Sequence, residues 1–492
     1  MRFRTGMAGV LRAALWAAIA GALLSGPAAS AAQGAKASAA ASQPSFSTTP
    51  ALDPAFASGV HDYAIRCGQD PVNVQVTVPA GWEAKLGLGP FQATDFVAQR
   101  PLTPGGALTV TFHRLSDSAS FTYHVRCLPA DFPVYRFGRT ASGGPEFFML
   151  QMDRNYVNDT YAAIFDRNGV PVWWYKTAAS PIDAELLSDG TVAWAPWNGG
   201  TSGGAFEIRT LDGQLVRTVG AAGGLPTDIH ELQLLPNGNY LLGGQVQKHV
   251  DASPYGGSTD ARVTGYQIQE LTPGGQLVWK WDSLQHIGLG QTPTRWWNQV
   301  LASGRPVLDI QHWNAVEPNG KNLLLSFRQL DAVYAINRTT GAIVWKLGGI
   351  HTSKSLKVQN DPDGSYPLGG QHDPRVLPDG TISIFDNRTG LNEPPRVVRY
   401  RINAKAKTAR LVQSFTDRTA TRSVCCGSAR MLPSGDWLVG WGGVKFAGAY
   451  NAQGRNIFRL QFPGGFSYRS FPVPPQALTA QQLRQAMNAM NP

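Results

Sequence analysis

The sequence predicts an all-β protein in which a six-bladed β-propeller follows a small β-sandwich domain. One observation is the composition: 54 Gly, 34 Pro and 14 Trp among 492 residues, with only 15% charged residues, are typical of many strands joined by tight turns. The other is that two short phrases alternate along residues 131–473, which indicates a repeat architecture. The chain is also long enough for more than one domain with a sizeable core.

The N-terminus carries a predicted export signal. Three arginines among the first twelve residues precede an apolar stretch at 13–24, and Ala29-Ser-Ala is a small-residue cleavage site. We therefore expect residues 1–31 to be a signal peptide and the mature protein to be soluble, secreted or periplasmic, where disulfides persist. Residues 32–50 are rich in Ala, Ser, Gln and Thr and are predicted to be a flexible linker.

Residues 51–130 are predicted to form the β-sandwich, because several short stretches in them alternate apolar and polar residues. Cys67 and Cys127 each end a strand-like phrase there, so a disulfide between them is favoured among the three pairings of four cysteines. Cys425 and Cys426 are adjacent. They are either free or joined in a vicinal disulfide, and the expected oxidising compartment favours the disulfide.

The first repeated phrase is a turn, Pro-Asn-Gly or a relative, next to an apolar strand. Proline presets φ and glycine adopts positive φ. Five copies begin at Ile182, His230, His312, His372 and Gly427. The second phrase, Gly-x-x-Val-Trp or a relative, begins at Gly169, Gly213, Gly275 and Gly341, with degenerate versions at Ala409 and Phe466. Six alternations give about 57 residues each, above the ~40–50 of a propeller blade, so five or seven blades stay open.

Three insertions explain the extra length, at residues 247–263, 284–307 and 350–369. The second and third come just before His312 and His372, so we expect them to act as lids at the histidine end of the propeller. Residues 474–492 form the predicted C-terminal tail. Within it, the run from Thr479 to Met490 has helical spacing and is expected to dock on the propeller.

Three of the five turn phrases place a histidine six residues before the turn proline: His230, His312 and His372. In strands of period two this fixes one face and one height, so rings arranged around an axis converge. Such rings could be channel residues bonded to water and backbone, ligands of zinc or copper, or an anion-transfer site with one histidine as nucleophile. Arg328 favours the last, because its planar cation suits an oxyanion and repels a metal ion. An ion pair with Asp331 or Asp309 is the alternative for this arginine.

The formal net charge of +10 comes from Lys and Arg that are scattered along the chain. A nucleic-acid-binding protein usually concentrates its basic residues on one face. The charge therefore favours attraction of small anions over nucleic acid.

The residues from Asp309 to Gly349, with His312-Trp-Asn and Ser326-Phe-Arg, resemble the bacterial arylsulfotransferase family. Further matching phrases are His230 with Leu235-Pro-Asn-Gly-Asn, Gln371-His-Asp with Leu377-Pro-Asp-Gly, and Met431-Leu-Pro-Ser-Gly. The resemblance covers most of residues 150–445. It implies a six-bladed propeller that moves a sulfuryl group from a phenolic sulfate ester to a phenol without a nucleotide donor, and the sequence contains no P-loop pattern.

By this resemblance, His372 matches the histidine that is transiently sulfated in a ping-pong reaction. His230, His312 and Arg328 match the residues that hold the sulfuryl oxygens and assist proton transfer. The implied partners are an aryl sulfate donor and a phenolic acceptor, with no metal, no cofactor, no nucleic acid and no stable membrane insertion; a homodimer stays open. Predicted to contact substrate are Trp296, Trp297, Trp313 and Asn314, with core packing as the alternative for the tryptophans.

Two features depart from the matched motifs. The opening Leu52-Asp-Pro-Ala-Phe with Asp62-Tyr-Ala-Ile resembles the cadherin-like modules of secreted bacterial proteins. The Cys425-Cys426 pair is similar to the vicinal disulfide of pyrroloquinoline-quinone alcohol dehydrogenases, which are the alternative enzyme class. Too few blades and no clear calcium-binding carboxylate cluster oppose that class. A non-catalytic ligand-binding propeller is the third possibility.

Overall fold

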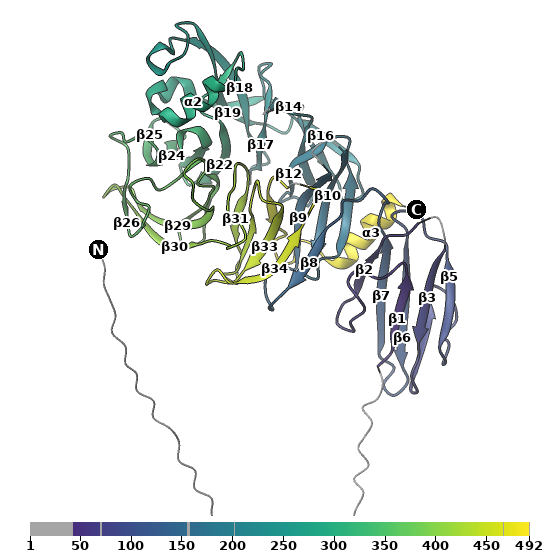
Figure 1. The fold of residues 1–492 in the computed structure, drawn as a ribbon. Coiled ribbons are helices and arrows are strands. Elements are labelled where there is room, and N and C mark those ends of the chain that lie inside the picture. The colour runs from purple at the N-terminus through teal and green to yellow at the C-terminus, as the bar shows by residue number, and fades with distance from the viewer. Residues whose placement is uncertain (1–42, 69–70, 155–157, 201, 466, 492) are drawn as a thin grey trace, which may run out of the picture. The chain divides into compact units, whose positions relative to one another are not determined.

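The first seven strands form a β-sandwich in a computed structural model that describes residues 43–68, 71–154, 158–200, 202–465 and 467–491 (Figure 1). The predicted signal peptide lies outside these residues. One sheet contains β1 (Ser45–Thr49), β3 (Val72–Thr77) and β5 (Phe96–Arg100); the other contains β2 (Asp62–Ile65), β7 (Ser120–Cys127), β6 (Ala107–Arg114) and β4 (Trp82–Leu86). Side chains of both sheets share one apolar core, and β3 alternates buried valines with exposed polar residues.

The sandwich begins earlier in the chain than the sequence predicted. Residues 45–49, assigned to the flexible linker, form β1, which pairs antiparallel with β3. The side chains of Phe46 and Thr48 alternate inward, so this stretch of small polar residues still buries one face. The rest of the predicted linker, residues 32–42, lies outside the described residues. The predicted disulfide between Cys67 and Cys127 is confirmed, with a Cα–Cα distance of 5.6 Å.

Within the described residues, the remaining strands pair into six sheets. The first three comprise β11 (Pro171–Lys176), β10 (Asn158–Asp166), β9 (Phe147–Arg154) and β35 (Ser470–Pro472); β12 (Ser180–Leu186), β13 (Val192–Trp197), β15 (Phe206–Arg209) and β16 (Leu215–Val219); and β14 (Ser202–Gly203), β17 (Thr227–Leu234), β18 (Tyr240–Val250), β19 (Ala261–Leu271) and β20 (Leu277–Asp282), with β21 (Leu308–Asp309) beside β19.

The other three sheets follow in chain order. They comprise β22 (Trp313–Asn319), β23 (Asn322–Phe327), β24 (Ala332–Asn337) and β25 (Ile343–Gly348); β27 (His372–Val376), β28 (Ile382–Asp386), β29 (Arg396–Asn403), β30 (Thr408–Phe415) and β26 (Lys357–Gln359); and β31 (Ser428–Met431), β32 (Trp437–Gly440), β33 (Phe446–Tyr450), β34 (Asn456–Gln461) and β8 (Arg136–Arg139). The all-β fold class is confirmed, and the arrangement is that of a β-propeller.

One strand of each sheet belongs to a continuous ring of neighbours. Strand β12 contacts β17, β17 contacts β22, β22 contacts β27, β27 contacts β31, β31 contacts β35, and β35 contacts β12 again. The two ends of the repeat region close this ring. Strand β8, from its start, pairs with β34 of the last sheet, and β35, from its end, pairs with β9 of the first sheet. This leaves few open strand edges.

In five sheets, the repeated turn phrase connects the ring strand to the next strand along the chain. In each copy the turn glycine has positive φ, for example 82° at Gly238 and 75° at Gly380. The Gly238 amide donates to the Leu235 carbonyl oxygen at 2.9 Å, which closes the turn. The degenerate copy of the second phrase, predicted to begin at Phe466, is described only in part. Phe466 itself lies outside the described residues, and residues 467–469 lead into the ring strand β35.

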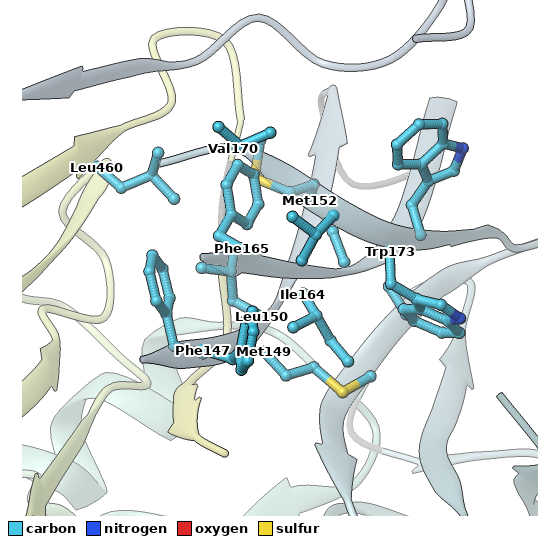
Figure 2. Close-up of a cluster of buried hydrophobic side chains, with 14 of the residues drawn as sticks. Phe147, Met149, Leu150, Met152, Ile164, Phe165, Val170, Trp173 and Leu460 are labelled. Carbon is cyan, nitrogen blue, oxygen red and sulfur yellow. The ribbon is translucent and has the colours of Figure 1, made fainter. Parts of the chain in front are cut away.

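The largest apolar cluster lies where the ring closes, on the strands around β9 and β10 (Figure 2). Helix α3 (Ala480–Met490) docks on this cluster. Thr479 caps it in a reciprocal capping box with Gln482, and Leu483 and Met487 are fully buried, so the predicted C-terminal helix is confirmed. The second insertion forms the short helices α1 (Ser283–His286) and α2 (Thr294–Ala302). No helix of the described residues is long and apolar enough to cross a membrane.

Candidate functional site

The three predicted histidines lie in or directly before neighbouring ring strands. His230 lies in β17, His312 immediately precedes β22, and His372 is the first residue of β27. The rings of His230 and His312 meet edge to face, with their centroids 4.9 Å apart. His312 has a φ of 49°, a left-handed conformation that is uncommon outside glycine and turns the backbone just before its strand. His230 and His372 are buried, and His312 is partly exposed.

Two of the imidazoles are held by carboxylates. The Nδ1 atom of His230 lies 2.7 Å from Asp228 Oδ1, and that of His312 lies 2.6 Å from Asp309 Oδ2. Since a carboxylate accepts, each Nδ1 carries the proton and each Nε2 is left free for an incoming group. Burial lowers the pKa of His312 from its ordinary value, although Asp309 opposes this effect.

The third imidazole is held by neutral groups. The Nδ1–H of His372 faces Asn387 Oδ1 at 2.8 Å and the Gly370 carbonyl oxygen at 3.0 Å. Its Nε2 accepts the backbone N–H of Cys426 at 3.0 Å. Burial, and then the nearby charge of Arg328, hold the pKa of His372 well below its usual range. His372 is therefore a neutral imidazole with its lone pair on Nε2.

Arg328 carries a buried charge that no carboxylate of the described residues pairs with. It begins the short 3₁₀ turn η3 (Arg328–Leu330) after β23. Its Nη2 donates to the Val424 carbonyl oxygen at 2.7 Å, and its guanidinium lies 4.4 Å from the centre of the Trp296 ring. The alternative expected for it, an ion pair with Asp331, is not formed, because Asp331 is bound by Arg295 and by the Trp296 indole nitrogen.

Cys425 and Cys426 carry free thiols, so the vicinal disulfide that the sequence favoured is not formed. A hydrogen bond from the Cys426 thiol is the first cause that lowers the pKa of Cys425. The Cys425–Cys426 segment lies directly over the site. The carbonyl oxygen of Val424, just before this segment, accepts from Arg328, and the backbone N–H of Cys426 donates to His372.

A cavity of about 400 Å³ opens onto His312, Arg328 and Cys425, a size that suits a small organic ligand. Residues of α2 and its following loop form much of the opposite wall. The remaining lining residues are Trp197, Gly200, Gln299, Val300, Ser303, Arg305, Val307, Asp309 and Gln329. The second insertion thus borders the cavity, as the sequence predicted for it.

The structure brings none of the three predicted tryptophans to the cavity wall. Trp297 is buried and stacks on Tyr255, with ring centroids 4.6 Å apart. Trp313 is buried in the core against Gly243, where a side chain would collide with its ring. Trp296 is buried beneath Arg328. The three indoles therefore take part in core packing, the alternative expected for them. For Trp296 and Trp297, the reason is that α2 turns its apolar face inward.

Asn314 is fully buried in β22, two residues after His312. Its Nδ2 donates to the Gln371 carbonyl oxygen at 2.8 Å, and its Oδ1 has no hydrogen-bond partner among the described residues. Through the Gln371 backbone it holds the residue next to His372. Its place in the structure is that of a support for the site, not of a wall residue of the cavity.

Three residues at the site were missed by the sequence analysis. Trp197, at the end of β13, is the aromatic residue that lines the cavity. Asn387 holds His372, and Tyr468 packs against the His230 ring at 5.8 Å between centroids. Tyr468 could have been found, because it lies two residues before a ring strand, close to the place that His312 has before β22. Trp197 and Asn387 lie outside the repeated phrases, so no spacing marks them.

Directly beside the histidines lies a second set of charges, which we call the ion cluster: Asp183, Glu231, Asp373, Arg375 and Arg469. Arg469 Nη1 lies 2.7 Å from Asp183 and 2.8 Å from Glu231, and Arg375 Nη2 lies 2.8 Å from both Glu231 and Asp373. These residues come from ring strands or the positions just before them, so the cluster ties four sheets together. Among the described residues, no group of three or more His, Cys, Asp and Glu side chains is arranged to hold a metal ion.

Fold and site together define a propeller-like protein with a cavity beside a group of three histidines. The sequence model of the arylsulfotransferase (ASST) family matches residues 138–461, about two thirds of the chain, and the protein belongs to this family. No curated protein matches the chain.

Solved structures resemble the chain at the level of the fold. A catalytically inactive virginiamycin B lyase from Staphylococcus aureus with quinupristin has 11% identity and a TM-score of 0.34, covering 67% of this chain and 99% of its own. The Cps50 (Swd1) β-propeller domain of Myceliophteria thermophila has 10% identity and a TM-score of 0.35, covering 69% and 90%. Apo AztD from Citrobacter koseri has 8% identity and a TM-score of 0.34, covering 68% and 98%.

Proposed function

We propose that the protein is an aryl sulfotransferase that moves a sulfuryl group from a phenolic sulfate ester to a phenol through a covalent intermediate on His372. The observation that carries this proposal is a set of neighbouring groups in a chain of the arylsulfotransferase family: a neutral imidazole, two carboxylate-held imidazoles and a guanidinium without a carboxylate partner among the described residues. Of these groups, His312 and Arg328 line the cavity, and His230 and His372 lie next to them. Sulfuryl transfer resembles phosphoryl transfer, in which alignment and charge stabilisation supply most of the catalysis.

In the first half-reaction, Nε2 of His372 attacks the sulfur atom of the donor. The new N–S bond forms as the bond between sulfur and the phenolic oxygen breaks. Arg328 offers a planar fork of donors to the sulfuryl oxygens, and His230 lies beside His312 to contact the same group. The departing phenolate takes a proton from Nε2 of protonated His312, while Asp309 stabilises the imidazolium. The Cys426 N–H has to release Nε2 of His372 before this attack.

In the second half-reaction, a phenol replaces the first product. It gives its proton to Nε2 of His312, its oxygen attacks sulfur, and the N–S bond breaks to restore neutral His372. The proton that His312 accepts in this step is the one that it donates in the next first step, so the cycle needs no external acid or base. The order of events is ping-pong, with no nucleotide and no cofactor.

We also propose the wider organisation of the chain. The six sheets with their ring of contacting strands support a six-bladed propeller over residues 131–473. The N-terminal sandwich is assigned as a cadherin-like module on its opening motif. Residues 1–31 are assigned as an export signal, and the Cys67–Cys127 disulfide supports an oxidising compartment.

The test is transfer between two phenols. Purified protein is incubated with 4-nitrophenyl sulfate, with and without phenol, and both nitrophenol and phenyl sulfate are measured. We expect steady release of nitrophenol only when phenol is present, in equal amount with phenyl sulfate, and parallel-line kinetics typical of ping-pong exchange. Release of free sulfate in place of phenyl sulfate would identify a hydrolase, and no release with any aryl sulfate would refute the proposal.

A further inference from the structure

The three imidazoles differ in one respect that the repeated motif does not show. His230 and His312 donate from Nδ1 to carboxylates, whereas His372 donates to a side-chain amide and a backbone carbonyl. A carboxylate partner favours the imidazolium, because it neutralises the positive charge. An amide partner also fixes the ring, but it carries no charge. The hydrogen bond to Asn387 raises the pKa of His372, and burial and Arg328 outweigh this effect.

The amide of Asn387 has a fixed orientation. Its Nδ2 donates to the Cys426 carbonyl oxygen at 2.9 Å and to Ser423 Oγ at 2.9 Å, and a carbonyl oxygen can only accept. Oδ1 is therefore the atom that faces His372. Asn387 is 1% exposed and immediately follows β28, which pairs with the strand of His372, so it has little freedom to turn away.

The far side of the His372 ring requires the same tautomer. The Cys426 N–H donates to Nε2, so Nε2 must carry the lone pair. Two independent contacts, one on each ring nitrogen, thus place the proton on Nδ1. The Asn387 amide also binds the carbonyl of the same Cys426, which connects the nucleophile's orientation to the segment that covers it.

We propose that Asn387 is the positioning residue of His372, and that its amide aims the imidazole with Nε2 as the attacking atom without placing a negative charge beside Nδ1–H. This inference rests on the proposed function and names the residue that distinguishes the nucleophile from the two carboxylate-held histidines. The charged and titratable groups that face His372 from the neighbouring elements are Arg328, Arg469, His312 and Cys426. The first three are cations when they are charged, so none of them favours an imidazolium.

The experiment compares Asn387→Asp with Asn387→Leu in the full-length mature enzyme. Single-turnover release of nitrophenol from 4-nitrophenyl sulfate is followed from pH 5 to pH 9. Asn387→Leu removes the acceptor without adding charge. We expect the rate of enzyme sulfation to fall by about 10- to 100-fold, the size seen when outer hydrogen-bond partners of metal-bound histidines are lost. The acid limb of the pH profile should not move to higher pH, because the lost hydrogen bond had raised the pKa of His372.

Asn387→Asp is expected to move the acid limb to higher pH, because a carboxylate beside Nδ1–H favours the imidazolium, which cannot attack. Merely structural damage would lower the rate at every pH and leave the limb in place. Ser423→Asp is the matched control for added charge, since Ser423 contacts the Asn387 amide nitrogen and not the imidazole. We expect it to move the limb less than Asn387→Asp does.

The failures of the two proposals are distinguishable. If wild-type enzyme forms no covalent sulfuryl intermediate, the proposed function is wrong. If wild type forms it, both Asn387 variants remain folded by circular dichroism, and the Asn387→Asp profile superimposes on that of wild type, the positioning role is overturned.

Discussion

Two neighbouring sets of charges at the propeller axis use the same residue types to opposite effect. In the ion cluster, Arg469 is fully buried between Asp183 and Glu231. Its Nη2 donates a hydrogen bond to the Asn314 carbonyl oxygen. At the candidate site, Arg328 is also buried, but it contacts one backbone carbonyl and the face of Trp296 and no carboxylate of the described residues. A buried charge that is fully paired within the chain stabilises the fold, whereas a charge with free donors beside a cavity is available to a ligand.

The largest expected effect concerns the nucleophile. His372→Ala should abolish formation of the covalent intermediate and lower kcat/KM by at least about 10⁴-fold, because no other group at the cavity can replace the attacking nitrogen. Steady-state assay with 4-nitrophenyl sulfate and phenol measures this. The propeller should unfold at nearly the wild-type temperature. A variant that retains more than a tenth of wild-type activity would show that His372 is not the nucleophile.

The comparison of the two arginines is tested by changing each to methionine. Arg328→Met should lower kcat/KM by about 10²–10³-fold with little change in the free energy of unfolding, because no carboxylate loses its partner. Arg469→Met should lower the free energy of unfolding by about 3–5 kcal/mol, since it leaves Asp183 buried without its cation and Glu231 with Arg375 alone. Denaturant unfolding and kinetics are measured on both. Equal losses of stability would remove the distinction between the two sets.

The acid–base role of His312 is tested at its carboxylate. Asp309→Asn should slow transfer to phenol by about 10²-fold, because the imidazolium that forms in the second half-reaction loses its stabilising charge. The first half-reaction with 4-nitrophenyl sulfate should change less, since nitrophenolate is weakly basic and its departure depends little on the proton that His312 supplies. Rapid-mixing kinetics separate the two steps. Equal slowing of both would assign Asp309 to the structure of the site alone.

The pH dependence follows from the direction of the His372 pKa. Burial and Arg328 lower it, so the neutral form that attacks persists at acidic pH. A histidine of ordinary pKa near 6.5 would lose about tenfold in rate at pH 5.5. We expect a smaller loss than this in the first half-reaction, measured as kcat/KM for 4-nitrophenyl sulfate. A full tenfold loss would mean that the ring is better solvated than its burial indicates.

The smallest effect is expected at the cavity wall. Trp197→Ala should raise KM for aryl substrates by about 3- to 10-fold, the usual contribution of an aromatic contact, and leave kcat nearly unchanged. Trp197→Phe should restore most of the affinity. A change in kcat without a change in KM would place the aromatic ring of the substrate elsewhere.

Much of the fold could be predicted because it depends on local signals. The turn phrases predicted the hairpins between the first two strands, and the helix after Thr479 followed from its spacing and cap. Strand β1 was missed because its residues are small and polar, and only pairing with β3 buries one face of them. The closure by β8 and β35 joins segments more than 300 residues apart, and no local pattern specifies such a pairing.

The candidate site, like the fold, could be predicted from the sequence only in part. His230, His312 and His372 share one slot of a repeated strand, so their spacing carried the prediction. Trp296, Trp297 and Trp313 were predicted from residue type alone. The burial of Trp296 and Trp297 depends on how the second insertion packs, and that of Trp313 on the packing of β22 against Gly243. Asn387 reaches His372 only after β28 pairs with β27, which the sequence does not show.

The central claim is that His372 carries the sulfuryl group between two phenols. The most direct measurement is peptide mass spectrometry of enzyme that has been quenched in alkali after mixing with 4-nitrophenyl sulfate alone. The account predicts one added SO₃ group on the peptide that contains His372, lost when phenol is added before the quench. An SO₃ group on another residue, or an unmodified enzyme that still transfers sulfate, would contradict it.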